Sequence, residues 1–288
     1  MDIRGKVIIS SLIMVFFISG CANNPSTQES SETPSITASA TKTTQLSSTP
    51  TQPLFTDTPE PSVNTLEIPT ETLKPTPTPD VPFEKVTFGT EDDVQIAATL
   101  FGEGDTALLM LHMGKGYADQ ESWHPFARLA AEGGFAALTI DLRGRGESEG
   151  ELHPPKIILD ARAGIYFLRQ RNFKRIACLG ASMGGTTCMR LALDADLAGI
   201  VVISSTRSVG GENGVSTQDL IAMEIPKLYV YGERDSIIPS EMELMFRNSA
   251  EPKQLITYDH AAHGTDLFLS THGDDLRQNL LKFLKDLP

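Results

Sequence analysis

The feature that most constrains the fold of this chain is a glycine-rich turn around one serine, Gly180-Ala181-Ser182-Met183-Gly184-Gly185. An apolar run typical of a β-strand, residues 175–179, leads into the turn, and a segment with helical spacing of apolar residues follows it. Glycines two residues before and two residues after Ser182 permit a sharp turn, because a Cβ at either place would collide with neighbouring backbone. We therefore expect Ser182 at the tip of the turn, above a helix N-terminus whose free N–H groups favour negative charge.

A serine hydroxyl group is a weak nucleophile at neutral pH, so a catalytic Ser182 requires a histidine base and an acid that orients it. Two later strand-like runs, residues 227–231 and 254–258, are each followed by suitable side chains. The candidates are the acids Glu233 and Asp235 and the histidines His260 and His263. Glycines near a strand end also make ordinary tight turns that have no catalytic role. The acid and histidine partners therefore decide whether Ser182 is interpreted as a catalytic serine or as part of a structural turn.

The order serine, acid, histidine, with each residue just past a strand, resembles the α/β-hydrolase superfamily over residues 83–288. Residues 111–116, Leu-His-Met-Gly-Lys-Gly, are similar to that family's loop after the third strand. Residues 141–148, Asp-Leu-Arg-Gly-Arg-Gly-Glu-Ser, are similar to its D-x-R-G-x-G-x-S segment after the fourth strand. Four signatures in this order are far more specific than any one of them.

The resemblance implies a catalytic triad with Ser182 as the nucleophile, Asp235 as the acid and His263 as the base. Glu233 stays open as an alternative acid, although it lies closer to its strand. His260 stays open as an alternative base, although His263 precedes a glycine, as the base does in many relatives.

The resemblance also implies two backbone N–H groups that stabilise an oxyanion. Met183, which follows the nucleophile, matches the family's first donor, and Gly114 most nearly matches the second. Met113 stands where the family usually has glycine, so the N–H group of Met113 is the alternative second donor. His112, in the same loop, is expected to be a structural, hydrogen-bonded residue.

Charged residues in the segment after the fourth predicted strand are expected to hold that loop together. They are Asp141, Arg143 and Arg145. An arginine at this place could also meet an acidic group of a substrate.

Neither a metal nor an organic cofactor is expected. His260 and His263 are close enough to share an ion, with Asp259 and Asp266 nearby, but no H-E-x-x-H helix or cysteine pair accompanies them. The sequence has no phosphate-binding G-x-x-x-x-G-K-[ST] loop and no strand-linked G-x-G-x-x-G segment, so a nucleotide cofactor is not implied.

The N-terminal residues predict export and anchoring to a membrane. Arg4 and Lys6 precede a short apolar stretch, which is too short for a typical spanning helix and fits a signal peptide over residues 1–20. Residues 18–21, Ile-Ser-Gly-Cys, resemble a bacterial lipobox, which implies cleavage before Cys21 and a diacylglycerol on its thiol. The alternative is a conventional signal peptide with an incidental cysteine. We expect the protein to lie outside the cytoplasm, held by lipid on Cys21.

Residues 21–80 are dominated by threonine, proline and serine, and lack the apolar content that offsets the entropy of ordering. We interpret them as a disordered tether that leads to one catalytic domain, residues 81–288.

Eight strand-like runs alternate with helical segments in residues 81–288, and the middle runs are apolar throughout, as in strands buried on both faces. We predict an α/β-hydrolase fold with a mostly parallel eight-stranded sheet. Residues 205–226 are too few for a large cap domain, so we expect an open site.

Charge and cysteines add two expectations. The full chain has a net charge of −13, and residues 81–288, with 20 basic and 29 acidic side chains, contribute −9 of it. Such an acidic domain is a poor partner for nucleic acid or for anionic lipid headgroups. Cys178 and Cys188 lie in the strand before Ser182 and the helix after it, and we expect both to be buried free thiols, with a disulfide between them as the less favoured alternative.

These observations together predict a serine hydrolase that cleaves small carboxylic esters or related acyl compounds through an acyl-enzyme. A peptidase, thioesterase or acyltransferase would use the same residues, so these activities stay open. A different alternative is a non-catalytic surface module that binds a ligand on the same fold. An intact set of serine, acid and histidine argues against it, because binding alone does not need all three.

Overall fold

The structure, a computed structural model, describes residues 81–211, 214–236 and 238–288. The expected signal peptide (1–20), Cys21 and the tether (21–80) lie outside the described residues. The elements follow one another as β1 (Phe83–Gly89), β2 (Gln95–Phe101), β3 (Thr106–Leu111), η1 (Gln120–Trp123), α1 (His124–Glu132), β4 (Ala136–Ile140), η2 (Pro154–Lys156), α2 (Ile157–Gln170), β5 (Arg175–Ala181), α3 (Met183–Leu191), β6 (Gly199–Ile203), α4 (Thr217–Ala222), β7 (Lys227–Gly232), α5 (Ile238–Asn248), β8 (Lys253–Tyr258), η3 (Gly264–Leu269) and α6 (Gly273–Lys285), where η denotes a 3₁₀-helix.

All eight strands belong to one sheet in the order β1-β2-β4-β3-β5-β6-β7-β8. β2 pairs antiparallel with β1 and with β4, and every other neighbouring pair is parallel. The prediction of a mostly parallel eight-stranded sheet is therefore confirmed. Because the parallel strands all end at one edge, the loops after β3, β4, β5, β6, β7 and β8 gather there.

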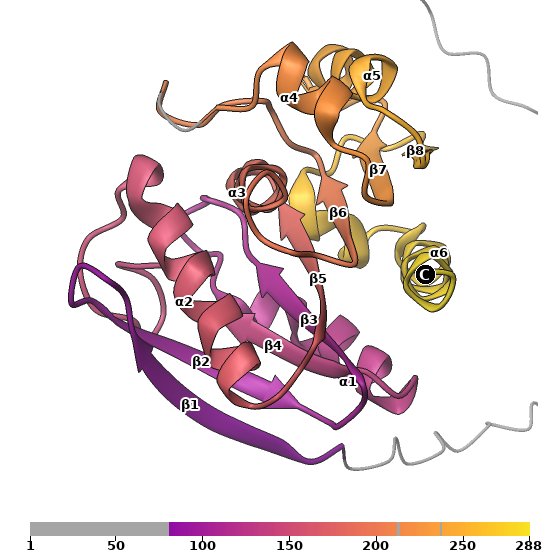
Figure 1. Ribbon diagram of the computed structural model, residues 1–288. Helices are drawn as coiled ribbons and strands as arrows, with labels where there is room; N and C mark the ends of the chain where they lie inside the picture. The colour runs from indigo at the N-terminus through magenta and orange to yellow at the C-terminus, as the bar shows by residue number, and fades with distance from the viewer. Residues whose placement is uncertain (1–80, 212–213, 237) are drawn as a thin grey trace, which may run out of the picture. The chain divides into compact units, whose positions relative to one another are not determined.

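Helices cover both faces of the sheet (Figure 1). Side chains alternate along each strand, so Leu109 and Leu111 of β3 join a core with α2, α3 and α5, whereas Leu108 and Met110 join a second core with α1 and α6. All four of these β3 side chains are fully buried. Burial on both faces explains why the central strands are apolar without alternation.

Between β6 and β7 the described residues form one short helix, α4. Ser216 caps it, with its hydroxyl group accepting from the N–H of Asp219 while the Asp219 carboxylate accepts from the N–H of Ser216. Six residues of helix do not make a domain, which agrees with the expected absence of a large cap. The two short elements α4 and η3 were not expected from the sequence.

Cys178 and Cys188 form a disulfide bond, with Cα atoms 5.5 Å apart, so the expectation of two free thiols is wrong. Their separation of 10 residues along the chain does not by itself bring them together. The turn at Ser182 does, because it folds α3 back so closely on β5 that a Cβ on Gly180 would collide with the backbone of Gly184. Both sulfur-bearing side chains then face the same core.

Within residues 81–288, apart from the short undescribed gaps, no helix has the length and apolar character needed to cross a membrane.

Candidate active site

Ser182 lies at the tip of a strained turn between β5 and α3. Its backbone angles are φ 52° and ψ −116°, in a region that residues other than glycine seldom adopt. A Cβ on Gly180 would collide with the backbone of α3, and a Cβ on Gly184 would collide with Leu111 of β3. The two glycines are thus needed for the reasons that the sequence suggests, and the turn raises a half-buried Ser182 above the helix N-terminus.

Hydrogen bonds from the neighbouring strand hold this turn in place. The N–H of Ser182 donates to the carbonyl of Ile203 in β6 at 2.8 Å. The carbonyl of Ser182 accepts from the hydroxyl group of Ser205 at 2.7 Å and from the N–H of Thr186 at 3.1 Å. The strained backbone of Ser182 is therefore fixed from both sides, as a preorganised nucleophile requires.

Asp235 and His263 meet beside this turn. His263 Nδ1 donates to Asp235 Oδ2 at 2.7 Å, and the Asp235 side chain is 8% exposed against 22% for His263. Backbone contacts bring their loops together, since the N–H of Arg234 donates to the carbonyl of His260 at 3.1 Å. With Nδ1 bonded to a carboxylate, His263 presents Nε2 as the nitrogen that can accept a proton.

The alternative acid and base have other partners. Glu233 Oε1 accepts from the hydroxyl group of Thr257 at 2.7 Å. His260 Nδ1 accepts from the N–H of Ala262 at 2.9 Å, and its ring packs edge-on against His272. Of the four candidates, Asp235 and His263 are the pair that forms a hydrogen bond.

The residues next to Ser182 and His263 lie close together. A Cβ on Gly264, which follows His263, would lie 3.5 Å from Cβ of Ala181 and 3.0 Å from Sδ of Met113. Within the described chain, no hydrogen bond joins the side chains of Ser182 and His263.

The loop after β3 lies against the residue that follows Ser182. A Cβ on Gly114 would be 3.5 Å from Sδ of Met183. The fully buried His112 fixes this loop through two hydrogen bonds. Its Nδ1 donates to the carbonyl of Met113 at 2.7 Å, and its Nε2 accepts from the N–H of Leu142 at 3.0 Å. Burial lowers the pKa of His112, which favours the neutral ring that these two bonds require. Gly114 thus lies beside the side chain of Met183.

Comparison with known proteins agrees with this architecture. The Alpha/beta hydrolase family model matches residues 108–223, which span the loop after β3 and the turn at Ser182. The Pyrococcus furiosus esterase Pf2001 superposes with a TM-score of 0.62 at 18% identity, over 72% of this chain and 93% of the esterase. The domain has the α/β-hydrolase fold.

Two curated proteins are also similar to this α/β-hydrolase-fold chain. The uncharacterized protein YfhR of Escherichia coli is 26% identical over 232 residues, which cover 70% of this chain and 80% of YfhR. The 2-hydroxy-6-oxononadienedioate/2-hydroxy-6-oxononatrienedioate hydrolase of Pseudomonas sp is 31% identical over 118 residues, 38% of this chain and 40% of that enzyme.

In this α/β-hydrolase fold, charged side chains hold the loop after β4 in place, as expected for Asp141 and Arg143. Asp141 Oδ1 accepts from the N–H of Gln120 at 2.8 Å, and its Oδ2 accepts from the N–H of Glu147 at 2.9 Å. The fully buried Asp160 and the partly buried Asp92 both accept hydrogen bonds from the Arg143 guanidinium. Arg145 differs in its partner: its guanidinium donates to the carbonyl of Gly114 in the loop after β3 at 3.3 Å, and it has no ion pair among the described residues.

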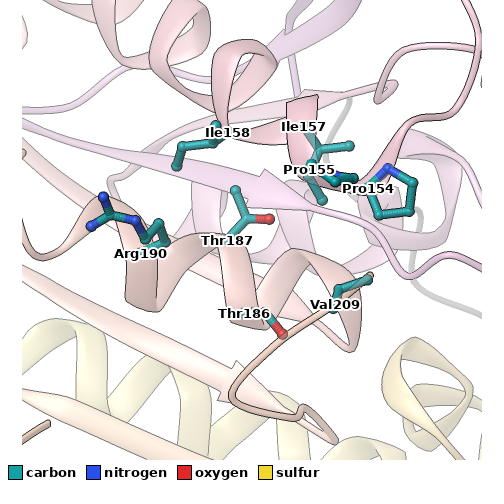
Figure 2. A pocket seen from close by; sticks show the side chains of 8 residues that line it. All are labelled: Pro154, Pro155, Ile157, Ile158, Thr186, Thr187, Arg190 and Val209. Carbon is teal, nitrogen blue, oxygen red and sulfur yellow. The ribbon is translucent and has the colours of Figure 1, made fainter. Parts of the chain in front are cut away.

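Two cavities lie near the candidate residues. Figure 2 shows a crevice between the start of α2 and α3. Its volume is about 10 Å³, room for about one water molecule, so it is not a substrate site. A cavity of about 300 Å³ lies between the loop after β3, the start of α1 and η3. Its wall includes Met113, whose sulfur lies against Gly264, and apolar side chains from η3 such as Phe268.

The part of the chain that the structure describes holds no group of three or more His, Cys, Asp or Glu side chains placed to bind a metal ion. His260 and His263 in particular are directed to different partners, Ala262 and Asp235.

Ser205 supports the turn at Ser182, a role that was not expected from the sequence. Its hydroxyl group bonds the Ser182 carbonyl and also meets Oγ1 of Thr186 at 3.0 Å. A serine just past a predicted strand is the one signal that could have suggested it, and many structural serines share that signal.

Proposed function

We propose that this chain is a serine hydrolase that cleaves carboxylic esters or related acyl compounds. The observation that carries the proposal is the hydrogen bond between His263 and the shielded Asp235, formed beside a strained serine at a helix N-terminus. An oriented imidazole and a preorganised hydroxyl group are what nucleophilic catalysis by serine needs, and a binding module needs neither.

In the proposed mechanism, His263 Nε2 takes the proton of Ser182 as Oγ attacks the carbonyl carbon of the substrate. The carbonyl oxygen becomes an oxyanion, stabilised by the N–H groups of Met183 and Gly114. The imidazolium, stabilised by Asp235, then donates its proton to the leaving alcohol, which leaves an ester of Ser182. Water, deprotonated by His263, attacks that ester, and the acid and the free serine are released.

Relatives named as esterases and as a hydrolase favour hydrolysis over other uses of the fold. Peptidase, thioesterase and acyltransferase activities use the same residues and differ in the leaving group or the acceptor. The short connection between β6 and β7 favours small or protruding acyl compounds, because no cap domain encloses the candidate site in the described chain.

The proposal is tested by treating the full-length protein with a fluorophosphonate probe and mapping the labelled peptide by mass spectrometry. A serine hydrolase is expected to carry one label, on Ser182, and to cleave short-chain esters, with amide and thioester analogues compared in parallel. Absence of any label, with no cleavage in any of the three series, would show a non-catalytic module instead.

Replacement of Asp235 by asparagine is expected to lower kcat by about 10⁴-fold, because the amide holds the imidazole in the wrong tautomer. Glu233→Gln is the matched control, since it makes the same chemical change two residues away and should leave kcat close to that of the unaltered protein. Steady-state kinetics on one ester would measure both. If Glu233→Gln gave the larger loss, Glu233 would be the acid.

We further propose that the protein is exported and anchored by lipid on Cys21, as the lipobox resemblance implies. The Cys178–Cys188 disulfide supports export independently, because disulfides persist mainly in oxidising compartments. Two acyl chains on one residue suffice for stable anchoring, since each buried CH₂ contributes about 0.8 kcal/mol.

Replacement of Cys21 by serine is therefore expected to move the protein from the membrane fraction to the soluble fraction while esterase activity is kept. Fractionation of cells that produce each form, followed by immunoblotting, measures this. Retention of Cys21→Ser in washed membranes would show that something other than the lipid anchors the chain.

A further inference from the structure

The loops at the C-terminal edge of the sheet carry five basic side chains, and four of them are paired with carboxylates. The pairs are Lys115 with Asp266, Arg143 with Asp92 and Asp160, Arg207 with Glu241, and Arg234 with Asp259. Arg145 forms no ion pair with any described residue. This is unexpected in a domain that carries 29 acidic and 20 basic side chains, where carboxylates are in excess.

The guanidinium of Arg145 has most of its hydrogen-bonding capacity unused. Nη2 donates to the carbonyl of Gly114 at 3.3 Å, and Nε is buried without a partner in the described structure. A guanidinium group has five N–H donors, and buried donors are nearly always satisfied. An arginine that is half-buried, charged and left without a carboxylate is therefore available for an anion that is not part of the protein.

Arg145 also lies close to the candidate nucleophile. Among the described residues, the one hydrogen bond of its side chain is to the carbonyl of Gly114, and Gly114 lies against Met183, the residue that follows Ser182. A ligand group held by Arg145 would thus lie beside the loop that faces a substrate carbonyl on Ser182. The neighbouring arginine, Arg143, cannot serve in this way, because its guanidinium is 3% exposed and is bonded to two carboxylates.

We propose that Arg145 binds a carboxylate of the substrate that is separate from the reacting acyl group, so that the preferred substrates are esters bearing one free carboxylate. This inference rests on the proposed hydrolase function and names its substrate class. A guanidinium matches a carboxylate in shape and charge, with two parallel N–H donors for two oxygens. A phosphate dianion fits less well, since the other described cations on these loops are already neutralised and the domain is acidic overall.

A purely structural role for Arg145 makes a different prediction. If its one task is to hold the Gly114 carbonyl, removal of the guanidinium would disturb the oxyanion loop and slow the hydrolysis of every ester equally. If Arg145 binds a carboxylate, its removal would raise KM for charged esters and leave neutral esters of the same size almost unchanged.

The experiment compares monomethyl glutarate with dimethyl glutarate, which differ in one charge, in the full-length protein and in Arg145→Met. Loss of a charge-assisted hydrogen bond is expected to raise KM for the monoester by about 10- to 100-fold. Activity on the diester should change little. Arg145→Lys should keep part of the preference for the monoester, because lysine retains the positive charge but lacks the two parallel N–H donors of the guanidinium. Arg190→Met, on α3 away from the loop, is the matched control and should behave as the unaltered protein.

A second pair, acetoxyacetate and its methyl ester, carries the carboxylate on the alcohol side, and comparison of the two pairs assigns the side on which Arg145 acts. Equal kcat/KM values for charged and neutral esters, or an equal loss on both in Arg145→Met, would overturn the inference while leaving the hydrolase function intact. If no ester is cleaved and no label forms, the hydrolase function fails. The carboxylate site is then tested separately by the effect of glutarate on Tm. A rise in Tm that Arg145→Met abolishes would support a carboxylate site at Arg145, and the absence of any rise would reject it.

Discussion

Replacement of Ser182 by alanine is expected to lower kcat for ester hydrolysis by about a millionfold, because the whole proposed mechanism depends on one oxygen nucleophile. Alanine keeps the Cβ and can occupy the same strained backbone conformation, φ 52° and ψ −116°. The surrounding hydrogen bonds use backbone atoms of residue 182, so the substitution does not remove them. Tm should therefore stay the same while single-turnover and steady-state kinetics both fall to background.

Ser208→Ala is the control for this experiment, since it removes an exposed hydroxyl group from the loop after β6. It should leave both kcat and Tm unchanged. Substantial activity in Ser182→Ala with a normal Tm would mean that another group attacks the substrate, and the assignment of the strained turn as the catalytic centre would be wrong.

Replacement of His263 by alanine is expected to lower kcat by a similar factor, about a millionfold, because nucleophile and base act as a unit. The double substitution of Ser182 and His263 should be little worse than either single one, for the same reason. His263 is partly exposed and lies on a loop, so its loss leaves no buried cavity and the fold should persist. Steady-state kinetics and thermal unfolding of the three variants would measure this.

His260→Ala is the matched control, three residues earlier in the same loop. His260 accepts a hydrogen bond from the N–H of Ala262, so its loss should lower Tm slightly and kcat far less than the loss of His263. The opposite ranking, with His260→Ala inactive and His263→Ala active, would make His260 the base.

Much of the fold was predictable because strong local constraints act on it. Gly180 and Gly184 permit the sharp turn at Ser182, where a Cβ would collide with neighbouring backbone, and apolar runs without alternation indicate strands covered on both faces. The runs 175–179, 227–231 and 254–258 are strands β5, β7 and β8 in the structure. The short elements α4 and η3 were not predicted, since a helix of six residues is too short to show a clear periodicity of apolar side chains.

The candidate site was predictable as a set of residue types and only partly as a geometry. The resemblance to α/β-hydrolases named Asp235 and His263, and left Glu233 and His260 open. Their different hydrogen-bond partners, Thr257 for Glu233 and Ala262 for His260, depend on how the loops after β7 and β8 pack together. No spacing in the sequence contains that information.

Backbone sterics and composition were enough to predict the strand-to-helix turn at Ser182, the pattern of strands and the acidic charge. The packing of the folded chain was needed to show that Cys178 bonds Cys188, that His263 meets Asp235, and that Arg145 is left without a carboxylate. Side-chain pairing depends on distances of a few ångströms between segments that are far apart in the sequence, and only the packed sheet and its loops bring these segments together.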